Sequence, residues 1–126
     1  MRVLIVDDYP DTAEATGVLL ESAGHECRTA TSGAEALAAA DAFNPELAIL
    51  DIGLPDIDGY ALLDVLRSRF SPRPPYIVAV TGWTHAFERA VDAGFDECLL
   101  KPAGREQLMR AVRLAQRRVL DDFDAD

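Results

Sequence analysis

The sequence predicts an α/β fold of three layers, in which a five-stranded parallel sheet lies between helices, and three observations support this class. Short apolar runs alternate five times with longer segments whose apolar residues recur at helical spacing. Most of the short runs are apolar throughout, which is typical of strands buried on both faces. Turn and capping residues separate the two kinds of segment. Right-handed crossovers would then place helices on both faces of the sheet.

The expected strands differ in their degree of burial. Apart from Arg2 at the start of the first, the runs at 2–6, 47–50 and 76–80 are continuously apolar, and we expect both faces of these strands to be covered. The run at 26–30 is more polar and fits an edge strand. A fifth, shorter strand is expected at 97–100.

The expected helices begin and end at residues with capping chemistry. Ser32 and Glu35 match a capping box, and Gly24 and Gly94 are typical of the residue that follows a helix. The predicted helices run from Pro10 to about Ala23, from Ser32 to just before Asn44, from Asp58 through Arg69, over about 85–93 and over roughly 105–120. Residues 1–120 therefore form one domain, and we expect the acidic tail at 121–126 to be disordered.

The composition limits the classes of function. The 126 residues are enough for one domain with a core of its own, and the apolar runs are far shorter than a membrane span. A net charge of −10 disfavours nucleic-acid binding, because phosphate neutralisation needs a basic surface. The two cysteines, Cys27 and Cys98, have no histidine at metal-ligand spacing. We therefore expect a cytoplasmic protein with neither a membrane nor a nucleic-acid partner.

Polar residues follow four of the five expected strands. They are Asp7 with Asp8, Asp51, Thr81 and Lys101, and parallel strands would bring them to one edge of the sheet. Two like charges about 4 Å apart repel by about 4 kcal/mol at an effective dielectric constant near 20. Either one carboxyl group is protonated or a cation lies among them, and a set of oxygen ligands alone favours Mg²⁺, with Mn²⁺ as an alternative.

This set of side chains indicates phosphoryl transfer onto an aspartate. A hard cation on few carboxylates shares its other positions with phosphate oxygens, and the Thr81 hydroxyl and Lys101 ammonium would hold the remaining oxygens. A free Asp51 carboxylate facing the cation is then a competent nucleophile. Considered alone, Asp51 is equally well interpreted as a residue that ends a strand and starts a turn.

The same residues resemble the receiver domain of two-component response regulators over nearly the whole chain. The matching segments, in order and spacing, are Val6-Asp7-Asp8, Leu50-Asp51 followed by Leu54-Pro55 and Asp58-Gly59, Thr81-Gly82, and Lys101-Pro102. The resemblance implies the flavodoxin-like strand order 2-1-3-4-5. It also implies a cis peptide bond between Lys101 and Pro102.

The resemblance assigns a role to each polar residue. Asp51 would accept a phosphoryl group from a histidine of a sensor kinase or a histidine phosphotransfer protein, and Thr81 and Lys101 would hold the phosphoryl oxygens. The domain would be a switch rather than an enzyme, limited to self-phosphorylation from donors and slow autodephosphorylation. The fourth helix, last strand and last helix would form the face for a target protein or a second copy.

The resemblance also implies the ligands of the metal ion. Asp8 would bind Mg²⁺ directly and Asp7 at least through water, with Asp51 and the Gly53 backbone carbonyl completing the protein's contribution.

Two positions depart from the family pattern. Cys98 stands where the family usually has an aromatic switch residue, so a ring cannot report phosphorylation there. Trp83, two residues after Thr81, either shields the acyl phosphate from water or only packs beside its loop, and the sequence leaves both open.

Three other classes of protein share parts of this pattern. A phosphatase of the haloacid dehalogenase type needs an aspartate where Gly53 stands, and in a flavodoxin Asp7-Asp8 would repel the flavin phosphate. The remaining alternative is a pseudo-receiver, a protein-interaction module that works without phosphorylation. The complete set of strand-end residues argues against it.

Overall fold

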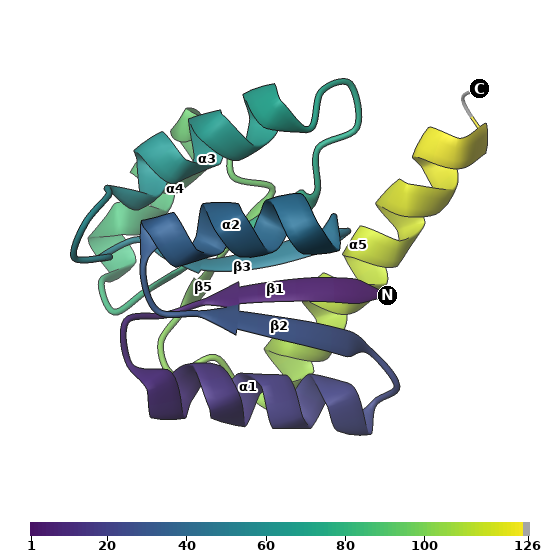
Figure 1. Ribbon diagram of the computed structural model, residues 1–126. Coiled ribbons are helices and arrows are strands. Elements are labelled where there is room, and N and C mark those ends of the chain that lie inside the picture. Colours follow the sequence, from purple (N-terminus) through teal and green to yellow (C-terminus); the bar gives the residue numbers. More distant parts are fainter. Residues whose placement is uncertain (125–126) are drawn as a thin grey trace.

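A computed structural model describes residues 1–124 as alternating strands and helices built on one parallel sheet (Figure 1). The strands are β1 (Arg2–Val6), β2 (Glu26–Ala30), β3 (Leu47–Asp51), β4 (Tyr76–Thr81) and β5 (Glu97–Leu100). The helices are α1 (Pro10–Ser22), α2 (Gly33–Phe43), α3 (Gly59–Arg69), α4 (Phe87–Ala93) and α5 (Arg105–Asp124), with a short 3-10 helix, η1, at Thr84–Ala86.

The sheet has the strand order β2-β1-β3-β4-β5, and every pair of neighbours is parallel. This confirms the predicted fold class and strand order. In the register of the sheet Val6 lies opposite Leu50, and Asp51 lies opposite Val80. The carboxyl ends of β1, β3 and β4 therefore meet at one edge, and the segments that follow them begin there.

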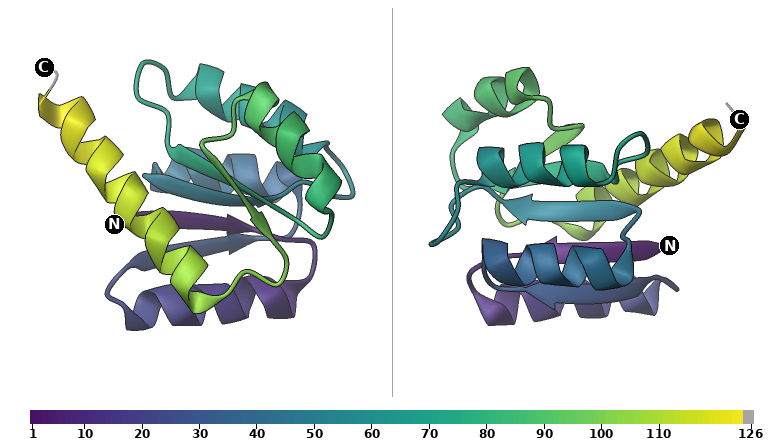
Figure 2. Two further views of the ribbon diagram at one scale, coloured as in Figure 1. Left: turned by 180° about the vertical axis from the view of Figure 1, so that it is seen from behind. Right: turned by 45° about the horizontal axis from the view of Figure 1, so that its top comes forward.

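Helices cover both faces of the sheet, as the two further views show (Figure 2). Buried residues of α1 and α5 pack on one face and those of α2, α3 and α4 on the other. All five residues of β3 are buried, which explains its continuous apolar run. Small residues bring α2 close to the sheet, since Ala36 and Ala40 are completely buried.

Local capping sets the helix boundaries that the sequence indicates. Ser32 Oγ accepts a hydrogen bond from the Glu35 amide at 3.2 Å, and Asp58 Oδ1 accepts one from the Tyr60 amide at 2.7 Å. Gly94 ends α4 with φ at +107°, a left-handed conformation that glycine adopts without strain.

The structure corrects the predicted end of the last helix. Helix α5 continues to Asp124, so 121–124 are helical where the sequence suggested the start of a disordered tail. Arg118 Nε lies 3.7 Å from Asp122 Oδ2, one helical turn further on, and this pair supports the extra turn. Residues 125–126 of the predicted tail lie outside the described residues.

Three smaller features complete the fold. The predicted helix at 85–93 begins as the 3-10 turn η1 before α4. Cys27 on β2 and Cys98 on β5 are free thiols on the two opposite edge strands. None of the helices within residues 1–124 combines the length and the apolar character that crossing a membrane requires.

Candidate functional site

The strand ends bring three of the predicted polar residues into the interior of the site. Asp7 is 6% exposed, Asp51 8% and Thr81 4%, and these are the buried polar residues of the described chain. Asp51 and Thr81 are the last residues of β3 and β4, one position beyond the predicted strand ends. Their backbones are therefore held by the sheet itself, which fixes the starting points of their side chains.

Three carboxylates form a compact cluster at this edge. Asp7, Asp8 and Asp51 each offer an oxygen, and these oxygens lie within 4.8 Å of one another. Burial raises the pKa of Asp8 above its ordinary value of 3.8, and the hydrogen bond to Asp51 and its charge raise it further. A bound cation would remove this repulsion, so the residues present fit a hard divalent ion such as Mg²⁺.

Lys101 joins two of the carboxylates. Its Nζ lies 3.0 Å from Asp7 Oδ2 and 3.0 Å from Asp51 Oδ2. Burial lowers the pKa of Lys101, but its hydrogen bonds to Asp51 and Asp7 outweigh this, so the pKa lies above its ordinary value of 10.5. The amine is therefore a permanent cation beside the predicted phosphoacceptor.

A hydrogen bond from a nearby backbone amide orients a side chain at three strand ends. The amide of Tyr9 donates to Asp7 Oδ1 at 2.9 Å, and that of Gly53 donates to Asp51 Oδ1 at 3.0 Å. Likewise the amide of Trp83 donates to Thr81 Oγ1 at 3.2 Å. In each case the donor lies two residues beyond the acceptor, which is the geometry of Asx and Ser/Thr turns. The loops after the strands therefore help to set the side-chain orientations.

A cavity of about 670 Å³ opens from this cluster between α1 and α5. Asp7, Asp51 and Lys101 line one end of it, and apolar residues such as Leu19 and Leu108 line its body. The site is therefore reachable from the surface.

The remaining predicted residues are also located. The peptide bond between Lys101 and Pro102 is cis, as the resemblance implied. Trp83 is 66% exposed, and Cys98 is half-buried against the core beneath α2, α3 and α4. The direction of the Gly53 carbonyl toward a metal ion stays a prediction.

One residue at the site's border carries no signal in the sequence pattern. Asp56 lies in the loop after β3, and its carboxylate accepts hydrogen bonds from the amides of Gly33 and Ala34. These partners are more than twenty residues away in the chain, so no local motif relates them to Asp56.

Known proteins are similar to this chain in sequence and in fold. The chain is 35% identical over 116 residues to the transcriptional regulatory protein KdpE of Mycobacterium tuberculosis. The matched region covers 92% of this chain and 51% of KdpE. It is 28% identical over 125 residues to the sensor histidine kinase RcsC of Escherichia coli, covering 99% of this chain and 13% of RcsC. The chain thus spans about half or less of the length of these curated relatives.

A solved structure has the same architecture. The response regulator TrrA of Thermotoga maritima, determined in complex with Mg²⁺ and BeF, superposes with a TM-score of 0.80 at 30% identity, covering 90% of this chain and 97% of that one. The family profile of the response regulator receiver domain matches residues 3–113. On this match, and on the fold that accompanies it, the chain belongs to the response regulator receiver domain family of two-component systems.

Proposed function

We propose that this receiver domain is a phosphorylation-dependent switch whose phosphoacceptor is Asp51. The observation that carries the proposal is the contact of Lys101 Nζ with Asp51 Oδ2 at 3.0 Å, within a cluster of three carboxylates. A carboxylate held beside a fixed cation, at the mouth of an open cavity, suits attack on a phosphoryl group.

The chemical step follows from the donor's class. An oxygen of Asp51 forms a bond to phosphorus while the bond from phosphorus to the donor's histidine nitrogen breaks, and that nitrogen keeps the electron pair and takes up a proton. Lys101 offsets the charge on the phosphoryl oxygens, and the Thr81 hydroxyl hydrogen-bonds to one of them. The product is an acyl phosphate, which water slowly hydrolyses.

A metal ion would assist this step. Asp7, Asp8 and Asp51, together with the Gly53 carbonyl, would hold Mg²⁺ or Mn²⁺, which neutralises charge on the phosphoryl oxygens when bound. The crowded carboxylates and the raised pKa of Asp8 support this assignment. The Mg²⁺ in the related TrrA structure supports it as well.

The proposed donor is a sensor histidine kinase or a histidine phosphotransfer protein. Relatives that are themselves sensor kinases or transcriptional regulators support this class of partner. We further propose α4, β5 and α5 as the face for a target protein or a second copy. Cys98 on β5 is half-buried. Because its side chain is small and has no aromatic ring, other residues of this face would report phosphorylation to the partner.

Intact-mass measurement after incubation with a small acyl-phosphate donor tests the assignment. We expect a single phosphoryl adduct that requires Mg²⁺, is absent from Asp51→Asn, and persists in Asp41→Asn, whose exposed carboxylate lies on α2. An adduct that survives Asp51→Asn would show that another residue is the acceptor. No adduct from the small donor or from a phosphorylated histidine protein would favour the pseudo-receiver.

A further inference from the structure

The loop between β3 and α3 is attached to the start of α2 through the carboxylate of Asp56. Asp56 Oδ1 accepts a hydrogen bond from the Gly33 amide at 2.8 Å, and Oδ2 accepts one from the Ala34 amide at 3.1 Å. These amides belong to the first turn of α2, where backbone donors need partners from outside the helix. The two bonds lower the pKa of Asp56, so the attachment is present throughout the neutral range.

Packing reinforces this attachment. A Cβ atom on Gly33 would lie 1.7 Å from Ile57 Cγ2, so the loop contacts α2 at a position where only glycine fits. Helix α2 is itself seated on the sheet through Ala36 and Ala40. The middle of the loop is therefore held against a rigid element rather than left in solvent.

The ends of the loop connect to the phosphoacceptor. The Gly53 amide donates to Asp51 Oδ1 at 3.0 Å, and the Ile52 amide donates to the Val80 carbonyl at 3.2 Å. At the far end the Gly59 amide donates back to the Ile52 carbonyl at 3.2 Å. Residues 53–58 thus form a loop that this hydrogen bond closes, with Asp51 just before it in the chain and Asp56 within it.

We infer that Asp56 is a positioning residue for the proposed phosphoacceptor site. By holding the loop on α2, it keeps the Gly53 backbone where its amide restrains Asp51 and where residue 53 can contribute to the metal site. Asp56 itself bonds only within the protein and acts through the loop. This inference rests on the proposed function, because it assumes that Asp51 and Gly53 take part in binding Mg²⁺.

Glu35 provides a matched control at the same helix end. Its Oε2 accepts hydrogen bonds from Thr31, at 2.7 Å from the amide and 2.8 Å from the hydroxyl. Glu35 and Asp56 are near enough for their charges to interact. Both variants Asp56→Ala and Glu35→Ala therefore remove one negative charge and two hydrogen bonds at the start of α2, but only Asp56→Ala releases the loop.

Titration calorimetry with Mg²⁺ alone, together with thermal unfolding of each variant, tests the inference. We expect Asp56→Ala to bind Mg²⁺ about tenfold more weakly than wild type, the lower end of the range for partners that orient metal ligands. Asp56→Asn keeps one acceptor oxygen, so its affinity for Mg²⁺ should lie between those of wild type and Asp56→Ala. Glu35→Ala should bind Mg²⁺ as wild type does while its melting temperature falls.

The outcomes separate this inference from the proposed function. No Mg²⁺ binding by wild type would contradict the metal site itself. Mg²⁺ binding that is equal in wild type, Asp56→Ala and Asp56→Asn would overturn the inference alone. An equal loss in Asp56→Ala and Glu35→Ala would also overturn it, because charge removal would then explain both. If Asp56→Ala fails to fold, the comparison of Asp56→Asn with Glu35→Ala decides the question.

Discussion

At the scale of single residues, carboxylates that look alike in the sequence have different surroundings in the fold. Asp51 has Lys101 Nζ and the Gly53 amide beside it. Glu97, the first residue of β5, has a buried oxygen, Oε2, without a hydrogen-bond partner in the described part of the chain. Burial raises the pKa of Glu97 above its ordinary value of 4.5, and Arg110, 4.0 Å away, offsets this only in part. Folding therefore disfavours the charged form of Glu97.

We predict that Glu97→Gln stabilises the protein at neutral pH by about 1 kcal/mol, because it removes a charge that burial leaves poorly solvated. Wild type should gain stability as the pH falls through the raised pKa of folded Glu97. The gain is complete below 4.5, where the unfolded state is protonated too. Thermal unfolding of both proteins as a function of pH should show their difference shrinking toward acid pH.

Glu26 is the control for this prediction, since it opens the other edge strand, β2, and is exposed. Glu26→Gln should change stability by less than about 0.5 kcal/mol at every pH. A Glu97→Gln protein that is less stable than wild type at neutral pH would show that the pair with Arg110 outweighs the burial.

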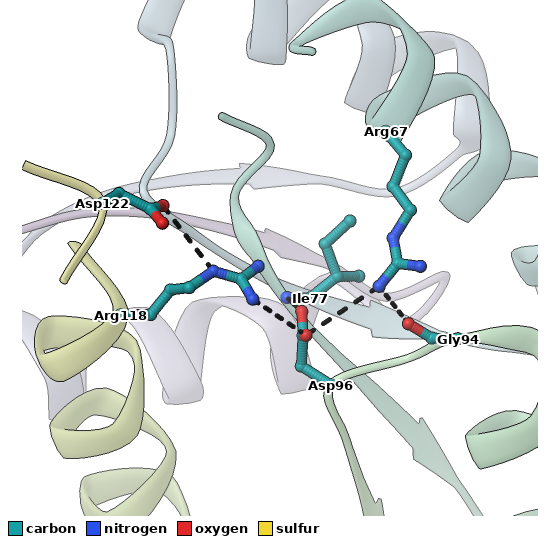
Figure 3. A network of polar contacts seen from close by, with 6 residues as sticks. All are labelled: Arg67, Ile77, Gly94, Asp96, Arg118 and Asp122. Atoms are coloured by element: carbon teal, nitrogen blue, oxygen red, sulfur yellow. Dashed lines mark hydrogen bonds and ion pairs between the residues drawn. The ribbon is translucent and has the colours of Figure 1, made fainter. Parts of the chain in front are cut away.

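At the scale of elements, Asp96 connects the two helical layers from the amino end of β5 (Figure 3). Its Oδ2 accepts a hydrogen bond from the Ile77 amide at 2.8 Å. Its Oδ1 lies 3.4 Å from Arg118 Nη1 of α5 and 3.9 Å from Arg67 Nη2 of α3. Arg67 also donates to the Gly94 carbonyl, so the start of β5 is tied to helices on both faces.

We predict that Asp96→Ala destabilises the protein by about 2 kcal/mol, because it leaves the Ile77 amide of β4 without its acceptor and removes one carboxylate partner from each of Arg67 and Arg118. Asp41→Ala, which breaks the exposed pair with Arg69 at 2.8 Å, should cost about 1 kcal/mol or less. Urea unfolding of the two variants measures the difference. Similar losses of unfolding free energy in both variants would mean that the Asp96 network stabilises the protein no more than an ordinary surface pair does.

At the scale of the whole molecule, the chain carries a net charge of −10, and three of its carboxylates, those of Asp7, Asp8 and Asp51, meet at one edge of the sheet. A cation that binds only the folded protein stabilises it through mass action. The acidic edge thus couples the stability of the entire domain to the proposed metal site.

We predict that Mg²⁺ at a hundredfold excess over its dissociation constant stabilises the protein by about 2.7 kcal/mol. The rise in melting temperature, followed by calorimetry, should disappear in Asp8→Asn. That variant should also melt higher than wild type when no divalent ion is added, because one member of the repelling cluster is neutral. A melting temperature unchanged by Mg²⁺ in wild type would contradict the metal site.

Local pattern was sufficient for most of the architecture. Burial on both faces makes a strand such as β3 continuously apolar, and capping at Ser32 and Asp58 needs only neighbouring residues, so both features are visible in a linear sequence. The predicted end of the last helix near Leu120 is wrong, because no glycine or proline ends the helix there and the pair of Arg118 with Asp122 supports a further turn of α5.

The sequence by itself determined the fold class, the strand order through its family resemblance, and the set of polar residues at the strand ends. Parallel strands deliver their last residues to one edge, so position along the chain predicts proximity there. Only the tertiary structure decided the attachment of Asp56 to α2 and the bridging position of Asp96. These contacts join residues about twenty positions apart, and their partners are backbone amides, which every residue but proline has and which leave no mark in the sequence.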